Sequence, residues 1–331
     1  MLGALSTMRK LKSFTVLIGL VALVSGCATS TTAPKAVAEL SGPAPLMLWK
    51  VTSDKRPSDG YILGSVHLGR SSDSEMDSAI REAYESSVAL IVEVDEDRYD
   101  SSEIQQLTMM KAAYPRGDSI INHVSTDTLA LLGQTFSKIG LPVKHFMRFK
   151  PWFLSLTASV LVMTRAGYSP DNGIDKRFIT RARAEKKPIG ELESPEYQID
   201  VLSSLAPEQD EENMRHTLAH IDEIGSEIEK IRNAYFTGNV EAMAEIVSSP
   251  SEENQGVKEY MEKVMYSRNR TMSQSIDRLL MDPGPYFIVI GVGHLVGDRT
   301  VLNYLKDKGY GIERVVPKGI PKISNEPTNI P

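Results

Sequence analysis

Residues 61–69 read YILGSVHLG, and residues 287–295 read FIVIGVGHL. Each stretch is an apolar, strand-forming run that ends in Gly-x-x-His, with His67 in the first and His294 in the second. In open α/β sheets, ligands bind at the carboxyl ends of the strands, so we expect the two histidines to lie together there. The repeated pattern therefore predicts one sheet built from two similar halves, with a Gly-x-x-His at the end of a strand in each.

The rest of the body predicts an α/β fold with a central mixed sheet and many flanking helices. Residues 88–92, Val-Ala-Leu-Ile-Val, form the continuous apolar run that is typical of a strand covered on both faces. Strands at both ends of the body, with helices between them, indicate a sheet assembled from distant segments. The predicted strands are 46–52, 61–67, 88–94, 187–192, 286–292 and 311–316. The predicted helices are 75–86, 103–112, 125–139, 152–166, 175–186, 195–204, 208–236, 240–248, 254–280 and 298–308.

The amino-terminal segment predicts export from the cytoplasm. Basic residues at positions 9, 10 and 12 precede the apolar run 14–24, which is shorter than the roughly 20 residues that a membrane-spanning helix needs. Small residues then lead to Cys27, the only cysteine in the chain. This arrangement resembles a bacterial lipoprotein signal, in which Cys27 carries lipid and two or three acyl chains, such as palmitate, give stable anchoring. A plain secretory signal with an incidental cysteine is the alternative, and translation can start at Met1 or at Met8.

These patterns divide the chain into four parts. Residues 1–26 are a predicted signal peptide, and 27–45, rich in Ala, Thr, Ser and Pro, are a lipidated cysteine and flexible tether. Residues 46–316 form the α/β body, and 317–331 form a loose tail. Ala28 after the cysteine favours sorting to the outer membrane, where the lipoprotein faces the periplasm.

Composition excludes several functions. The chain has 331 residues, with 37 Lys and Arg against 43 Asp and Glu, so its net charge is −6. An acidic chain without a basic run lacks the charge pattern of nucleic-acid binding. One cysteine permits neither an internal disulfide nor a Cys-based zinc cluster. The sequence also has no Gly-x-Ser-x-Gly elbow, no P-loop and no dinucleotide-binding glycine pattern.

The chemistry-bearing candidates are His67, His294 and Glu93. Two copies of Gly-x-x-His favour a shared site, although a single copy would more simply be a polar residue in a strand-to-helix loop. Glu93 follows an apolar strand, where an unpaired carboxylate is costly to bury, so it is either a site residue or the partner of a structural Arg or Lys. His216 and His220 have a metal-chelating spacing, but they lie opposite the apolar face of their predicted helix and are interpreted as solvated.

The ordered motifs of the body resemble those of the TraB/GumN family, from about Trp49 to Val316. The family is related to the Tiki metalloproteases, the erythromycin esterases and the ChaN-like haem-binding lipoproteins, and it implies an α/β fold with a repeated half. The motifs are Gly64-Ser65-Val66-His67, Glu93 in Ile-Val-Glu-Val-Asp, Lys150-Pro151-Trp152, Gly173-Ile174-Asp175, Gly190-Glu191-Leu192-Glu193 with Gln198, Arg268-Asn269 with Met272, and Gly291-Val292-Gly293-His294 followed by Gly297.

The resemblance implies a site made of His67, His294, Glu93 and Arg268. On this hypothesis the protein is a divalent-metal-dependent hydrolase that acts on a peptide or protein through a metal-activated water. Two imidazoles and a carboxylate suit Mn, Co, Fe or Zn. Glu93 is either the third ligand or the general base, and Arg268 stabilises the oxyanion.

Supporting roles are expected for three further residues. They are Glu193, which can instead cap the helix that follows it, Asn269 and Asp175. The alternative function is a non-catalytic envelope lipoprotein that sequesters a peptide signal or binds haem.

Overall fold

The structure is a computed structural model that describes residues 46–73, 77–247 and 255–317. The predicted signal peptide, the tether with Cys27 and the tail after residue 317 lie outside these ranges. Within them, no helix has both the length and the apolar character needed to cross a bilayer.

A six-stranded sheet in the order β4-β3-β5-β2-β1-β6 organises the described residues. The four strands from β4 to β2 run parallel, whereas β1 is antiparallel to both of its neighbours. The sheet is therefore mixed, and strands from both ends of the body share it, as predicted. The strands are β1 (Leu48–Thr52), β2 (Gly60–Ser65), β3 (Ala89–Val92), β4 (Ile189–Glu191), β5 (Tyr286–Gly291) and β6 (Gly311–Arg314).

The two strands that precede the histidines are direct neighbours. β2 and β5 pair in parallel, with Gly64 opposite Ile290 and Ser65 opposite Gly291. A Cβ added to Gly64 would lie 3.0 Å from the Val292 side chain, so glycine lets the segment after β5 approach closely. This register brings the two strand ends to the same edge of the sheet.

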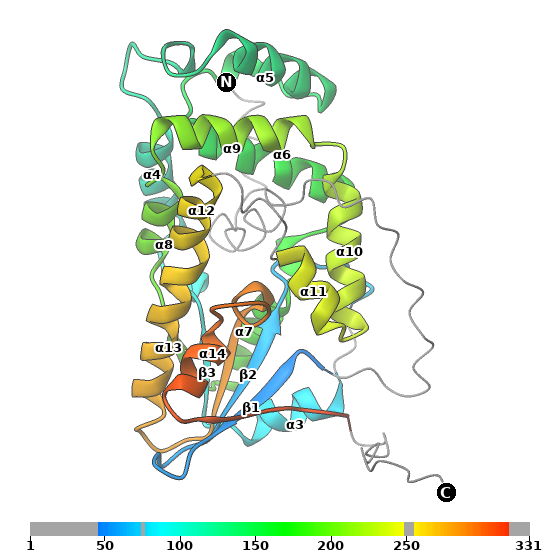
Figure 1. Cartoon of the computed structure of the whole chain (residues 1–331), viewed down its shortest axis with the longest axis vertical. Helices are drawn as coiled ribbons and strands as arrows, with labels where there is room; N and C mark the ends of the chain where they lie inside the picture. The colour runs from blue at the N-terminus through cyan, green and yellow to red at the C-terminus, as the bar shows by residue number, and fades with distance from the viewer. Residues whose placement is uncertain (1–45, 74–76, 248–254, 318–331) are drawn as a thin grey trace, which may run out of the picture.

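Helices cover both faces of the sheet. Side chains alternate between the two faces along each strand, and apolar side chains on each face pack against helices. Leu63, Leu90 and Phe287 face α3 and α7, whereas Ile62 and Ile288 belong to the larger core that includes α13 and α14. In Figure 1 the sheet fills the lower part of the molecule, and α6 and α9 cross its upper part. The helices are α3 (Ser78–Ser86), α4 (Ser101–Ala112), α5 (Thr126–Lys138), α6 (Pro151–Arg165), α7 (Ile174–Glu185), α8 (Pro195–Leu202), α9 (Pro207–Ala219), α10 (Ile224–Phe236), α11 (Val240–Val247), α12 (Gln255–Met261), α13 (Ser267–Leu279) and α14 (Val301–Asp307).

One of the predicted helices is divided in the structure, and another contains a π-helical turn. The prediction of one helix over 208–236 is wrong, because α9 ends at Ala219 and α10 begins at Ile224. A straight helix of that length would extend about 1.5 Å per residue and leave the core. The turn instead lets apolar residues of both helices pack into the core. The predicted helix 254–280 is α12 and α13 joined by a π-helical turn, Glu262–Tyr266.

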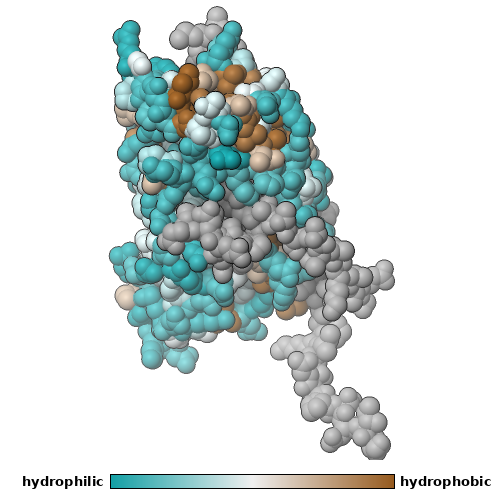
Figure 2. Space-filling model, turned by 45° about the horizontal axis from the view of Figure 1, so that its top comes forward, coloured by the Kyte–Doolittle hydropathy of each residue, from teal (hydrophilic) through white to brown (hydrophobic). Residues whose placement is uncertain are grey.

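The visible surface is mostly hydrophilic, with apolar side chains gathered near its upper end in Figure 2. Some polar groups are buried, and Asp210 on α9 is one of them. Burial raises the pKa of Asp210 to about 8, although Lys150 and the Trp152 backbone N–H act in the opposite direction. At neutral pH this side chain is therefore largely a neutral acid.

The protonation of Asp210 predicts a pH-dependent stability difference for Asp210→Asn. In the unfolded chain this carboxyl ionises near its ordinary pKa, so the wild type loses stability as pH rises from about 4 to 8, by about 1.4 kcal/mol for each pH unit. The uncharged amide of the variant does not titrate. Its free energy of unfolding, measured by denaturant titration, should therefore rise relative to that of the wild type across that pH range. Asp222→Asn, on an exposed residue, should give a flat difference. A flat difference for Asp210→Asn as well would contradict the prediction.

Candidate functional site

His67, Glu93 and His294 converge on one point at the end of β5. A Cβ added to Gly291 would lie 3.1 Å from His67 Nε2, 3.2 Å from Glu93 Oε1 and 3.6 Å from His294 Cδ2. The separation of His67 Nε2 and His294 Cδ2 is therefore no larger than the sum of their two distances from that Cβ position. His67 lies two residues after β2, Glu93 directly follows β3, and His294 ends the short helix after β5. Three neighbouring parallel strands thus deliver the three side chains to one place.

The imidazole of His294 is held in one orientation. Its Nδ1 lies 2.5 Å from Asn269 Oδ1, and Asn269 Nδ2 donates to the carbonyl of Arg299 at 2.9 Å. Because that second bond orients the amide, its oxygen accepts from Nδ1–H. The Nε2 atom is buried without a hydrogen-bond partner, 3.8 Å from Glu93 Oε1. Burial and the charge of Arg268 lower the pKa of His294 to about 3, which leaves a neutral ring with a free lone pair on Nε2.

The second imidazole, that of His67, has a carboxylate neighbour. Its Nδ1 lies 3.3 Å from Asp175 Oδ1, in the first turn of α7. Burial alone would lower the pKa of His67, but the negative charges of Asp175 and Glu93 outweigh burial and raise it to about 9. His67 and His294 thus share an arrangement in which Nδ1 faces a polar side chain and the rest of the ring faces Gly291. Metal-binding histidines commonly have this kind of partner on their second nitrogen.

Glu93 belongs to a buried ion-pair network. Its Oε1 accepts from the Gly291 N–H at 2.6 Å, and its Oε2 accepts from Arg268 Nη2 at 2.9 Å. Burial would raise the pKa of Glu93, but the positive charges of Arg268 and His67 and the Gly291 N–H lower it to about 2. Arg268 also bonds both carboxylate oxygens of Glu193, at 2.8 and 2.9 Å. One guanidinium therefore bonds two carboxylates.

The π-helical turn before α13 helps to place Arg268. The guanidinium is completely buried, and its Nη1 donates at 3.1 Å to the carbonyl of Val264, inside that turn. Such turns are frequent at functional sites. Arg268 is thereby directed at the two carboxylates.

The structure also shows where Glu193, His216 and His220 lie and what they contact. Glu193 does not cap α8, because the Ser194 hydroxyl does so by accepting from Tyr197 N–H. His216 and His220 stack with ring centroids 4.4 Å apart, and both are only partly exposed.

Two further residues contact the site without having been assigned a role from the sequence. Gln198 Nε2 donates to Glu193 at 3.0 Å and lies 3.4 Å from Glu93, and its place in a family motif was the available signal. The Tyr235 hydroxyl donates at 2.6 Å to the carbonyl of Gly64, and no sequence pattern pointed to it.

The side chains in the described part of the chain do not form a complete set of metal ligands. None of their His, Cys, Asp and Glu side chains forms a group of three or more that could hold a metal ion. The feature that fits such an ion is the free Nε2 of His294, beside His67 and Glu93.

Comparisons with known proteins agree with the sequence motifs. Residues 47–314 match the model of the TraB/PrgY/gumN family. The uncharacterized protein YbaP of Escherichia coli is 22% identical over 246 residues, which cover 74% of this chain and 87% of YbaP. The Shigella flexneri YbaP matches equally well. No solved structure matches.

A shorter match concerns a metalloprotease. A metalloprotease TIKI homolog of Amphimedon queenslandica is 44% identical over 55 residues, which are 16% of this chain and 11% of that protein. Because the family model spans most of the body, from β1 to β6, the chain belongs to the TraB/PrgY/gumN family.

Proposed function

We propose that this protein is a divalent-metal-dependent hydrolase that cleaves peptide bonds. The observation that carries the proposal is the unpartnered, buried Nε2 of His294, which a bond to Asn269 leaves as a free lone pair beside His67 and Glu93. A buried nitrogen without a partner is costly unless a ligand satisfies it. The local similarity to a metalloprotease TIKI homolog adds support from a different source.

His294 would hold the metal through its Nε2 atom, and His67 would do so through the same atom after its ring releases a proton, with Glu93 as third ligand or as general base. When bound, a divalent ion of Mn, Co, Fe or Zn lowers the pKa of a water molecule toward neutrality. Asn269 orients the His294 ring through Nδ1, and the Asp175 carboxylate lies 3.3 Å from Nδ1 of His67. Glu93, kept ionised by Arg268 and the Gly291 N–H, can accept a proton at Oε1.

Arg268 takes a different role from the one expected from the sequence. Its guanidinium is completely buried and bonds Glu93 and Glu193, so a substrate oxyanion has no access to it in this arrangement. We assign Arg268 and Glu193 to positioning, since together they fix the Oε2 end of Glu93 and leave its Oε1 end toward the histidines.

The experiment combines metal analysis with peptide cleavage. The purified full-length protein, kept in mild detergent, is loaded with Mn²⁺, Co²⁺, Fe²⁺ or Zn²⁺ and incubated with a peptide library. We expect bound metal and cleaved peptides for the wild type, and loss of both for His67→Ala and His294→Ala. His123→Ala, at an exposed histidine paired with Asp118, is the matched control. Equal metal content in all four proteins would refute the proposal.

Other outcomes would favour the alternative functions. A Soret absorption band on the purified protein would indicate haem, and a peptide that binds but stays intact would indicate sequestration.

The proposed location is the bacterial cell envelope, with the body anchored by lipid at Cys27 and facing the periplasm. The support is the sequence of residues 1–45, with its short apolar run and single cysteine. Metabolic labelling with palmitate should mark the wild type and leave Cys27→Ala unlabelled. Label on both proteins would contradict the anchor.

Gly291→Ala tests whether the space between the three side chains is used. The backbone at Gly291 (φ −53°) accepts alanine, but the methyl group would lie about 3 Å from His67 Nε2 and Glu93 Oε1. Displacement of reacting groups by about 1 Å can cost on the order of a hundredfold in rate, and we expect a loss of that size. Gly225→Ala on α10, where a Cβ meets nothing within 4 Å, is the control. Unchanged hydrolysis by Gly291→Ala would show that this space is not used.

A further inference from the structure

Arg299, in the loop between His294 and α14, has an unusual backbone conformation. Its φ is 52°, and the only other non-glycine residue with a positive φ in the described ranges is Lys186, at the end of α7. A residue with a side chain rarely adopts this left-handed conformation, and it persists only where the surroundings hold it, often at a functional site. The contacts of the Arg299 side chain and of its carbonyl explain why it persists here.

The π-helical turn Glu262–Tyr266 holds the Arg299 side chain. Glu262 Oε2 accepts from Arg299 Nη2 at 2.7 Å, and the guanidinium carbon lies 4.1 Å from the centre of the Tyr266 ring. The Arg299 side chain is 44% exposed, so the ion pair alone would hold it weakly, and the contact with the ring adds to it. Helix α13, which follows the turn, packs beside α14 (Figure 1). These contacts join the turn to the loop before α14.

The carbonyl of Arg299 faces the side chain that orients His294. It accepts from Asn269 Nδ2 at 2.9 Å, and Asn269 Oδ1 lies 2.5 Å from His294 Nδ1. Rotation about φ moves this carbonyl relative to the chain before it, so a return of φ to the usual negative range would turn the oxygen by roughly 100°. The left-handed conformation therefore aims the oxygen at Asn269.

This carbonyl determines which end of the Asn269 amide faces His294. A carbonyl oxygen only accepts hydrogen bonds, so it selects the NH₂ end of the amide and leaves Oδ1 toward Nδ1 of His294. An amide turned by half a rotation would instead donate to Nδ1 and place the imidazole proton on Nε2. The free lone pair of Nε2, which faces Glu93, would then be lost.

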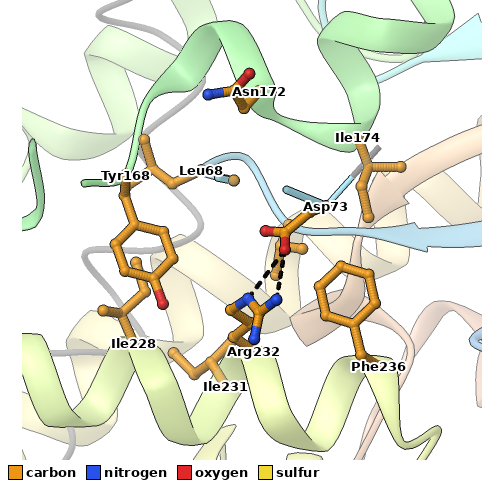
Figure 3. Close-up of a pocket in the computed structure, with 11 residues that line it drawn as sticks. Leu68, Asp73, Tyr168, Asn172, Ile174, Ile228, Ile231, Arg232 and Phe236 are labelled. Atoms are coloured by element: carbon orange, nitrogen blue, oxygen red, sulfur yellow. Dashed lines mark hydrogen bonds and ion pairs between the residues drawn. The ribbon is translucent and has the colours of Figure 1, made fainter. Parts of the chain in front are cut away.

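The chain around the other imidazole, that of His67, is fixed by dense packing. A Cβ added to Gly173 would lie 2.6 Å from the carbonyl oxygen of His67, so the two segments are in contact. Leu68 and Ile174, the next residues of these segments, line a cavity beside α10 that has room for about one water molecule (Figure 3). The state of His294, in contrast, depends on one amide that can turn.

We propose that Arg299 is a positioning residue that sets the tautomer of His294. Its guanidinium, held by the π-helical turn, keeps its backbone left-handed, and its carbonyl then fixes the Asn269 amide so that the proton of His294 stays on Nδ1. The inference rests on the proposed function, since a metal ion needs the lone pair on Nε2. The same turn also accepts from Arg268, so it supports both the His294 side and the Glu93 side of the site.

NMR of the histidine rings tests the proposal without metal or substrate. The full-length protein in mild detergent is labelled with ¹⁵N in its six histidines, and His294 is assigned from the signals that His294→Gln lacks. Long-range ¹H–¹⁵N spectra show which ring nitrogen carries the proton. We expect the proton of wild-type His294 on Nδ1. A wild-type ring with its proton on Nε2 would overturn the proposal.

Variants of Arg299 separate the side chain from the backbone. In Arg299→Ala the ratio of the Nε2–H to the Nδ1–H tautomer of His294 should rise roughly fivefold, the size of one net hydrogen bond. Arg299→Gly also lacks the guanidinium but adopts a positive φ without strain, so its ratio should lie closer to that of the wild type. Arg278→Ala, at an exposed arginine of α13 that bonds Ser275, is the matched control. If Arg299→Ala does not fold, Glu262→Gln takes its place.

Two results would contradict the role of Arg299. One is an unchanged tautomer ratio in Arg299→Ala, or in Glu262→Gln where that variant replaces it. The other is a larger change in Arg299→Gly than in Arg299→Ala, because the backbone conformation would then not be what matters.

Metal titration separates this inference from the function on which it rests. Co²⁺ should bind Arg299→Ala about tenfold more weakly than the wild type, within the range for residues that orient a metal-binding histidine. If the wild type binds no metal and cleaves no peptide but the tautomer ratio changes as expected, the hydrolase proposal fails and the role of Arg299 stands. If the wild type binds metal and cleaves peptides and Arg299→Ala equals it in tautomer ratio and affinity, only the role of Arg299 fails.

Discussion

Glu93→Gln is expected to lower peptide hydrolysis by roughly 10²- to 10⁴-fold, the range for loss of a general base. The amide keeps the size of the side chain but cannot accept a proton at the atom that faces His294. Folding should survive, because Arg268 keeps its bonds to Glu193. The measurement is kcat/KM of the metal-loaded enzyme together with its metal content.

The metal content of Glu93→Gln decides between the two roles left open for Glu93. Bound metal with lost activity would make it the general base, whereas lost metal would make it the third ligand. Glu193→Gln is a closely matched control, since it changes the other carboxylate on Arg268, and no contact joins Glu193 to either histidine. We expect it to lose far less activity. Wild-type activity in Glu93→Gln would remove Glu93 from the mechanism.

Arg268→Met is expected to lower the free energy of unfolding by about 3–5 kcal/mol, as when one partner of a buried ion pair is removed. Methionine fills part of the volume but leaves the carboxylates of Glu93 and Glu193 buried without their shared cation. Denaturant titration measures the loss. Adding Glu193→Gln to Arg268→Met should restore part of the stability, because one of the two uncompensated charges is then absent.

The neighbouring Arg270 provides the control for Arg268→Met. Arg270 lies on the same helix with a 52% exposed side chain, 3.9 Å from Glu262. Arg270→Met should change stability by no more than about 0.5 kcal/mol, as is usual for surface substitutions. If Arg268→Met does not accumulate as folded protein, recovery of folded protein in the double variant is the readout. Equal stability of Arg268→Met and the wild type would mean that the ion-pair network contributes nothing.

The sheet was the most predictable part of the fold. All six strands lie within or overlap the predicted ranges. The clearest are β3 and β5, because a strand buried on both faces requires an uninterrupted apolar run. Helix continuity was less predictable. Neither glycine nor proline marks the turn between α9 and α10, since the division serves packing into a common core rather than local backbone preference.

The residues of the candidate site also differ in how well the sequence predicted them. His67, Glu93 and His294 stood out in the sequence because each follows an apolar strand. Their partners Asp175, Asn269 and Gln198 were named only through the family resemblance, because they contact the site from helices that lie far away in the chain.

The amino-acid sequence by itself determined which strands form the sheet and that Gly-x-x-His recurs at two strand ends. Apolar periodicity and glycine placement are local properties, and they can be read without coordinates. Only the tertiary structure decided what each charge faces. It brought Arg268 to Glu93 and Glu193, across 175 and 75 residues of chain, and turned an expected oxyanion contact into a buried ion-pair network. The physical reason is that a buried charge is stable only beside its counter-charge, and the packing of distant helices selects which counter-charge that is.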